Sequence, residues 1–274
     1  MRHFKFLVAV FAVFISLVGC YDQKKSSNSS KSEKEISSTD EKIIEFNVDG
    51  VKFSMVEVEG GTFTMGATED QGNDDLDEEK PIHEVTLSSY CIGQTEVTQE
   101  LWQAVMGDNP SKFKGAKRPV DCVSWDDCQE FIRKLNEKTG KNFRMPTEAE
   151  WEYAARGGNR SQHYKYSGSN DADDVAWCGQ ALEDKVEGTH DVATKRPNEL
   201  GIYDMSGNVY EWCSDWYGDY NSSSQTNPQG PSNGSDRVSR SGCYLDLDEN
   251  IPLSIRCGVM PDFCDDIFGL RLAL

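Results

Sequence analysis

Apolar and polar residues alternate along the chain from residue 43 onward, and this period of two predicts β-strands. The alternation runs through residues 43–46 and again through residues 53–58, and the glycine pair 60–61 leads into a third stretch at 63–66. We expect a β-hairpin in this region.

Three later stretches have the helical period. Each combines a capping residue, apolar side chains on one face and a glycine stop, over residues 98–107, 124–140 and 147–158. Thr98 caps the first helix, and the other two begin with capping boxes, Ser124 with Asp127 and Thr147 with Glu150. Beyond residue 158 the chain is rich in Gly, Asn, Asp and Ser, which predicts short strands and loops.

Few helices among short strands and long loops predict an α+β, loop-rich fold. Residues 221–235 read as a turn-rich surface loop, and the acidic run 71–80 reads as a solvated loop because it lacks the ligand spacing of an EF-hand. We find no second linker between residue 43 and the end. Residues 43–274 are therefore predicted to form one domain.

The N-terminus has the pattern of an export signal. Arg2 and Lys5 precede an apolar run over 6–18 that is too short to span a bilayer comfortably. The run ends in Leu-Val-Gly before Cys20, which resembles a bacterial lipobox, so we expect cleavage after residue 19 and a lipid on Cys20; the alternative is an ordinary signal peptide with a coincidental cysteine. Residues 20–42, mostly Ser, Lys and Glu, are predicted to be a flexible tether. We therefore expect an exported protein, anchored by its lipid to the bacterial membrane at the outer-membrane cell surface.

Charge and cysteine content restrict the partners. With 28 Lys and Arg against 47 Asp and Glu, the formal charge of -19 repels a phosphate backbone, so nucleic acid binding is not expected. Eight cysteines remain besides Cys20, and their pairing cannot be chosen from sequence. No Cys and His spacing typical of a structural zinc site is present.

Five motifs occur in the order and spacing of a known family. They lie at residues 58–66, 96–98, 119–125, 144–158 and 197–212. Together they resemble the formylglycine-generating-enzyme, or sulfatase-modifying factor, domain. The resemblance implies an elaborated C-type lectin fold, in which long loops pack around a small central antiparallel sheet.

The oxidases of that family carry two cysteines five residues apart, whose thiolates hold copper and engage the substrate cysteine. When residues 241–244 are aligned with the segment preceding that pair, Asp246 and Ile251 fall at the two thiol positions. A carboxylate and an aliphatic group cannot form a thiolate pair. No catalytic residue, and no cofactor for catalysis, is therefore expected.

The C-terminal segment is more similar to the variable proteins of diversity-generating retroelements, and among them to the lipid-anchored treponemal variable proteins. The constant frame of that branch is matched at Arg237, Val238, Arg240, Gly242, Arg256, Pro261, Asp262 and 269–272. The resemblance implies a ligand-binding segment at 243–267 in which Tyr244 is followed by thirteen variable positions, here called the slots: Leu245, Asp246, Leu247, Asn250, Ile251, Ile255, Cys257, Gly258, Val259, Phe263, Asp265, Asp266 and Ile267.

In that branch, mutagenesis directed at adenines cannot produce Met, Trp, Gln, Lys or Glu. None of the thirteen slots holds one of these types, whereas Glu249 and Met260 do and must then be constant positions. The alternative is that the apolar slots are core positions of terminal strands. The mixture of acidic and apolar residues without a clean period favours an irregular, partly exposed binding surface.

A second constellation lies at 204–211. In the enzyme branch the matching positions bind calcium, which implies the carboxylates of Asp204 and Glu211 with the carbonyls of Gly207 and Val209, a set of hard oxygen ligands. The alternative is that the two carboxylates accept hydrogen bonds within the turn. The neighbouring aromatic residues at 210–220 are expected to be core and loop anchors rather than a platform for sugars.

These observations predict a non-enzymatic, surface-displayed lipoprotein that binds an unknown protein or other surface ligand through residues 243–267. No cofactor is required for catalysis, and a structural Ca²⁺ is the one candidate ion, with hydrogen bonding of the two carboxylates within the turn as its alternative. The alternatives are an oxidase of the formylglycine-generating type, an accessory factor to one, or a structural envelope lipoprotein.

Overall fold

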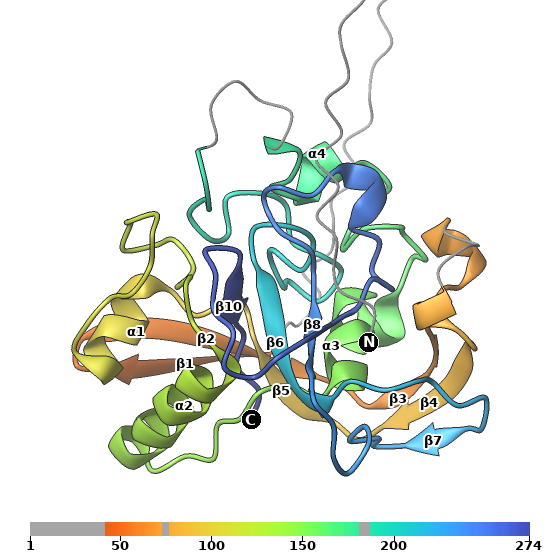
Figure 1. Ribbon diagram of the computed structural model, residues 1–274, viewed down its shortest axis with the longest axis horizontal. Helices are drawn as coiled ribbons and strands as arrows, with labels where there is room; N and C mark the ends of the chain where they lie inside the picture. The colour runs from red at the N-terminus through yellow and green to blue at the C-terminus, as the bar shows by residue number, and fades with distance from the viewer. Residues whose placement is uncertain (1–41, 73–76, 181–186) are drawn as a thin grey trace, which may run out of the picture. The chain divides into compact units, whose positions relative to one another are not determined.

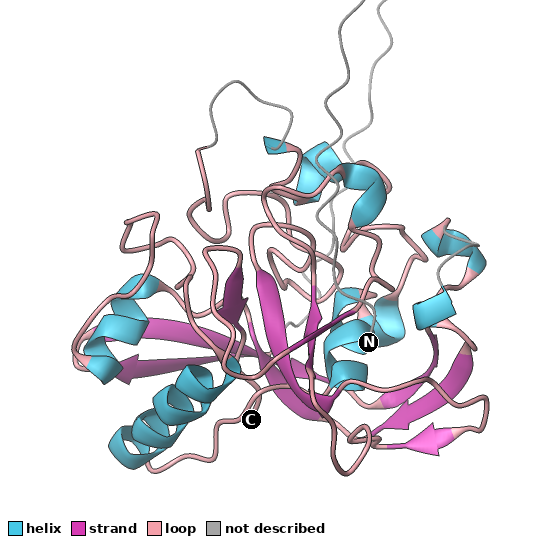
Figure 2. Cartoon of the chain, viewed as in Figure 1, coloured by secondary structure: helices cyan, strands magenta, loops and turns pink. Residues whose placement is uncertain are grey.

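The computed structural model describes residues 42–72, 77–180 and 187–274, which belong to one compact unit spanning Asp40–Leu274. The predicted signal, Cys20 and most of the tether lie outside the described residues. Within the described part the chain forms three small sheets, four α-helices and long connecting loops (Figure 2). No helix in this part is long and apolar enough to cross a membrane.

The predicted hairpin is present. Strands β1 (Ile43–Val48) and β2 (Val51–Val58) pair antiparallel, and β5 (Tyr90–Gly93) adds to the other edge of β2. Asp49 and Gly50 connect β1 to β2 with φ of 51° and 91°. Two positive φ values are what a tight two-residue hairpin turn requires, and a glycine adopts them without strain.

The stretch after this hairpin joins a different sheet. Strand β3 (Gly61–Met65) pairs antiparallel with β4 (His83–Leu87), whose other edge takes the two-residue strand β7 (Gln225–Thr226) in parallel. The loop predicted at 221–235 therefore contributes one short strand before returning to solvent.

The central sheet is built by the C-terminal part of the chain, in the order β10-β6-β8-β9. Its strands are β6 (Tyr210–Trp216), β8 (Arg237–Arg240), β9 (Cys257–Val259) and β10 (Phe268–Leu270) (Figure 1). The expectation of an antiparallel sheet holds for two of its three pairs, while β10 runs parallel to β6. A parallel neighbour needs a long connection, and residues 217–267 supply it.

The three predicted helices are α1 (Gln99–Met106), α2 (Trp125–Thr139) and α3 (Glu148–Ala155), and a fourth, α4 (Ala172–Val175), is a single turn. Thr98 accepts a hydrogen bond as the cap of α1, and both predicted capping boxes form. The helix starts were therefore predictable from local sequence.

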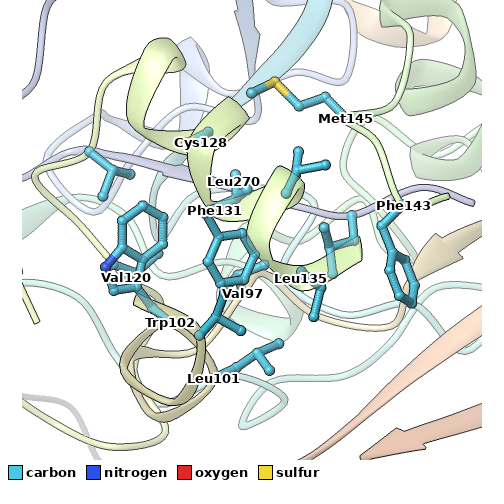
Figure 3. Packing of buried hydrophobic residues seen from close by; sticks show 14 of the residues in the cluster. Val97, Leu101, Trp102, Val120, Cys128, Phe131, Leu135, Phe143, Met145 and Leu270 are labelled. Atoms are coloured by element: carbon cyan, nitrogen blue, oxygen red, sulfur yellow. The ribbon is translucent and has the colours of Figure 1, made fainter. Parts of the chain in front are cut away.

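The core beneath these helices joins the two ends of the domain. Trp102 of α1 stacks on Phe131 of α2 with ring centroids 4.9 Å apart, and Leu270 of β10 belongs to the same buried cluster (Figure 3). Phe131 and Leu270 are fully buried. Truncating such a buried aromatic costs about 3 to 5 kcal/mol, so this packing holds the C-terminal sheet against α2.

Candidate functional site

Two buried arginines of the C-terminal part meet the acidic face of α3. Arg240, with no exposed side-chain surface, donates to Glu148 Oε1 and to Glu152 Oε2, both at 2.7 Å. Arg256 donates to both oxygens of Glu148 at 2.7 and 2.9 Å. Although burial opposes ionisation, Arg256 and Arg240 together lower the pKa of Glu148 to about 2. We call these four residues the α3 ion-pair network.

A third buried arginine holds the end of the chain. Arg271 donates to Glu211 Oε1 at 2.7 Å and to Oε2 at 2.9 Å, and the indole nitrogen of Trp151 donates to Glu211 Oε2 at 2.6 Å. Arg271 also donates to the carbonyl of Gly93 on β5. Buried charges require such complete pairing, because an unpaired one costs several kcal/mol.

Between Arg240 and Arg256 the chain makes a compact turn and a short 3-10 helix, Asp248–Asn250. The Asp246 carboxylate accepts from the backbone N–H of Cys243 at 2.9 Å. The backbone carbonyl of Asp246 accepts from the N–H of Gly179, and the carbonyl of Tyr244 accepts from the N–H of Gln180. The loop that follows α4 thus supports this part of the segment through backbone contacts, which do not depend on slot side chains.

After Arg256 the chain runs as strand β9 beside β8 and then turns at residues 260–263, where the N–H of Phe263 donates to the carbonyl of Met260. The carbonyl of Asp265 accepts from Cys122, and that of Ile267 accepts from Tyr210. Here too, backbone groups of neighbouring elements hold the segment.

Most predicted slots are accessible. Four are exposed, namely Asn250, Gly258, Phe263 and Asp265, and seven are partly exposed, namely Leu245, Asp246, Leu247, Ile255, Cys257, Val259 and Ile267. A mixture of acidic and apolar side chains therefore reaches solvent along the segment. That character suits recognition of a ligand.

Three of the predicted ligand-binding residues are buried, which corrects the prediction for them. Ile251 is 0% exposed and packs in a small cluster with Tyr166 and Val175. Tyr244 is 1% exposed, and Asp266 is buried in an ion pair with Lys112. The sequence pattern could not separate these positions from their neighbours because the segment has no regular period.

One exposed slot is sterically restricted. A Cβ added to Gly258 would lie 2.7 Å from Cγ of the Tyr217 ring, so a side chain there requires the ring to move. Gly242, a constant position, is more restricted, because its φ is +80° and a Cβ would lie 2.3 Å from Ile251. Only glycine fits at position 242, where the segment begins to turn.

Two thiols lie near Asp246. Burial, with the Asp246 carboxylate as second cause, raises the pKa of Cys257 to about 11 and the pKa of Cys243 well above its usual range. Both thiols are therefore protonated at neutral pH, and all eight cysteines of the described residues are free. Ile251, at the other aligned thiol position, offers no metal ligand.

Two of the predicted calcium ligands, Glu211 and Gly207, have protein partners. Both oxygens of Glu211 already accept from Arg271 and Trp151, and the Gly207 carbonyl accepts from the Ser241 hydroxyl. Asp204 is buried with its Oδ1 unpartnered, and burial raises its pKa to about 6. Within the residues that the structure describes, no three His, Cys, Asp or Glu side chains are grouped so that they could hold a metal. The resemblance implies that Ca²⁺ neutralises the charge of Glu211. Here the guanidinium of Arg271 pairs with that carboxylate.

The acidic residues of α3 were missed from the sequence. Glu148 and Glu152 lie one turn apart on a short helix whose other residues, apart from the capping residue Glu150, are apolar. Carboxylates that such a helix buries need cationic partners, and this is the signal that the sequence offered. The aromatic residues at 210–220 also have a structural role, since the rings of Tyr217 and Tyr220 lie 4.4 and 4.0 Å from the guanidinium of Arg256.

A pocket of about 190 Å³ adjoins the α3 ion-pair network and is lined by residues that include His83, Asp215, Tyr220 and Arg256. Burial, followed by the charge of Glu148, raises the pKa of Asp215 to about 7. Since Tyr220 donates to Glu148 and packs on Arg256, the polar groups of this wall are engaged with each other.

Known proteins resemble the chain in both sequence and structure. The sulfatase-modifying factor enzyme 1-like domain matches residues 47–274. Chaperone protein LppX of Paenibacillus barcinonensis is 37% identical over 242 residues, covering 71% of this chain and 80% of that protein. The formylglycine-generating enzyme of Streptomyces coelicolor is 30% identical over 288 residues, covering 80% and 88%.

Among solved structures, Treponema denticola variable protein 1 matches with a TM-score of 0.74 and 34% identity, covering 84% of this chain and 98% of that one. The match extends over nearly all of that protein. The chain therefore belongs to the sulfatase-modifying factor enzyme 1-like domain family, with a fold shared by a treponemal variable protein.

Proposed function

We propose that this protein is a lipid-anchored, surface-displayed binding protein without enzymatic activity, and that its ligand contacts the accessible slots of residues 243–267. The observation that carries the proposal is the separation of roles within this segment. The buried Arg240 donates to the carbonyl of Leu253 and the buried Arg256 pairs with Glu148, and these contacts fix the segment, while eleven of the thirteen slots keep exposed surface. The similarity to a variable protein supports the same division.

The anchor is a separate part of the proposal, motivated by the lipobox-like residues ending at Cys20. Palmitate labelling of the expressed chain is expected to disappear in Cys20→Ser. Equal labelling of both proteins, or a mature N-terminus at another residue, contradicts it.

The binding role is tested by exchanging the accessible slots Leu245, Leu247, Ile255 and Phe263 together, with Tyr244 and Ile251 unchanged. The variant is expected to unfold cooperatively near the parent and to lose the parent's surface ligand, captured by crosslinking on cells. Unchanged ligand capture contradicts the proposal. Sequencing of the gene from related isolates gives an independent test, because diversification predicts substitutions concentrated at the slots.

The enzymatic alternative rests on the 30% identity to a formylglycine-generating enzyme. The residues at the thiol positions, Asp246 and Ile251, argue against it, because neither is a thiol. Copper-treated protein mixed with a sulfatase-type cysteine peptide is expected to give no aldehyde. Turnover that disappears in Cys243→Ser or Cys257→Ser supports an oxidase instead.

The 37% identity to a protein named as a chaperone supports a second candidate function, binding of non-native polypeptides. It is distinguished from the first by the state of the ligand. A chaperone suppresses aggregation of an unfolding client protein, whereas a variable binding protein recognises a native surface and leaves that aggregation unchanged.

A further inference from the structure

An apolar tip projects from the turn that follows β9. Met260 is 57% exposed and Phe263 is 39% exposed, and these are two of the four large hydrophobic side chains exposed in the described residues. The N–H of Phe263 donates to the carbonyl of Met260, so one tight turn carries both side chains. We call this pair the Met260–Phe263 tip.

The tip rests on a rigid base. The Phe263 ring meets the edge of Phe268 with centroids 5.8 Å apart, and Phe268, 5% exposed, stacks on the buried Trp212 at 5.0 Å. The backbone N–H of Asp126 donates to the carbonyl of Pro261, which ties the turn to the start of α2. A partner would therefore meet a preformed apolar contact, with little ordering cost.

Carboxylates flank the tip, both along the chain and at the start of α2, where the N–H of Asp126 donates to Pro261. Asp126 and Asp262 are exposed, and no ion pair within the described residues reaches either of them. Asp265 and Asp266 share one cation, Lys112, and so leave a net negative charge beside the tip.

The other nearby cation is enclosed. The guanidinium of Arg237 lies 3.8 Å from the ring centre of Trp125 and 3.5 Å from that of Trp216, and it donates to the carbonyl of Ser214. Its charge is felt by Asp126, but no ion pair joins the two residues in the part of the chain that the structure describes, so the Asp126 carboxylate stays open to a partner. An apolar centre with an acidic rim is complementary to a partner that is apolar and cationic.

We propose that the Met260–Phe263 tip docks a cationic, amphipathic polypeptide segment, whose apolar side chains pack on the tip and whose Lys or Arg side chains meet Asp126 and Asp262. This inference rests on the proposed binding function and names the chemistry of its ligand. The formal charge of -19 on the whole chain favours the approach of such a partner at low salt.

The test uses three synthetic peptides of about five helical turns, titrated into the mature chain by fluorescence anisotropy. The first has Leu on one face and Lys on the other, the second replaces Lys with Glu, and the third replaces Leu with Ser. Binding of the first at least tenfold tighter than either other peptide is expected. Equal binding of the Glu peptide, or no binding of the first, overturns the proposal.

Variants locate the site. Phe263→Ser is expected to weaken binding of the Leu and Lys peptide about tenfold, as for a central apolar contact, and Met260→Ser by a similar factor. The double variant Asp126→Asn and Asp262→Asn is expected to weaken it about three- to tenfold at low salt, with less effect at high salt.

Ile82, just before β4, and Glu84 on β4 provide a matched control at another place on the molecule. Ile82 is 48% exposed and Glu84 is exposed on β4, so Ile82→Ser and Glu84→Gln remove the same chemistry elsewhere. Their binding is expected to equal the parent's. Met260 is 57% exposed, so Met260→Ser still tests the site if Phe263→Ser is unstable.

The outcome is distinguishable from failure of the proposed function. If the peptide does not bind while slot exchange still abolishes capture of the surface ligand, the binding function stands and the cationic ligand is wrong. If the peptide binds equally well to Phe263→Ser and Met260→Ser, the tip is not the docking site.

Discussion

The packing of α2 against α1 and the segment at 243–267 contrast in what holds them. In α2, a capping box, one apolar face and the glycine at 140 specify the helix locally, and apolar side chains such as Phe131 fill the core. The 243–267 segment has little regular structure, and buried ion pairs and backbone hydrogen bonds from distant elements fix it. In the second region the residues that determine shape are therefore different from those that face solvent.

The sharpest way to break this arrangement is to remove a buried cation. Arg240→Ala leaves Oε2 of the buried Glu152 without its cation, while Arg156 still pairs with Oε1, and the loss is expected to cost about 3 to 5 kcal/mol of unfolding free energy. Urea denaturation measures the loss. Arg133→Ala in α2 is the control, since its ion pairs with Glu130 and Glu137 are solvent-exposed and are expected to matter by less than about 1 kcal/mol. Similar losses in both variants would contradict the contrast.

A slot pair tests the assignment of core and surface within the segment. Ile251→Asp places a charge in a fully buried cluster and is expected to cost about 3 kcal/mol or more. Leu247→Asp, at a partly exposed slot, is expected to change stability by about 0.5 kcal/mol. Thermal unfolding of both compares them directly, and equal destabilisation would make the whole segment core.

The pH dependence of stability tests the buried charges beside the segment, through Asp215. Asp215 has a pKa of about 7 when folded, against an ordinary value of 3.8, so between these pH values the unfolded chain releases a proton that the folded chain retains. Asp215 therefore lowers stability progressively as pH rises from about 4 to 7, by an amount of about 2 to 4 kcal/mol.

Asp215→Asn removes this titration. Denaturant midpoints measured from pH 5 to pH 8 are expected to fall less in the variant than in the parent. Parallel curves for the two proteins would show that Asp215 is not the titrating group.

The smallest expected effect concerns calcium. Because Arg271 and Trp151 occupy both oxygens of Glu211, excess Ca²⁺ is expected to leave Tm unchanged, whereas a true site would contribute about 2.7 kcal/mol at a hundredfold excess over Kd. A rise in Tm that disappears in Glu211→Gln contradicts this. A rise that persists in Glu211→Gln but disappears in Asp204→Asn would instead identify Asp204, together with the buried Glu96 beside it, as the site.

The sequence predicted much of the fold because its signals are local or shared with a family. Capping residues such as Thr98 and Ser124 sit next to the helices that they start, and their hydrogen bonds form within three residues. The motifs at 144–158 and 197–212 indicated the family, which the comparisons confirm. The parallel pairing of β10 with β6 has no local signal, because its partners lie far apart in the chain.

At the candidate site, the resemblance predicted which positions are constant and which are slots, but the sequence did not determine their burial. Leu247 and Ile251 are similar apolar residues four positions apart, yet the first is partly exposed and the second is fully buried. The difference comes from the residues around α4 that cover Ile251, and from α3, whose Glu148 and Glu152 hold the arginines on either side. Burial and charge pairing depend on contacts between segments some ninety residues apart, and only the tertiary structure brings those segments together.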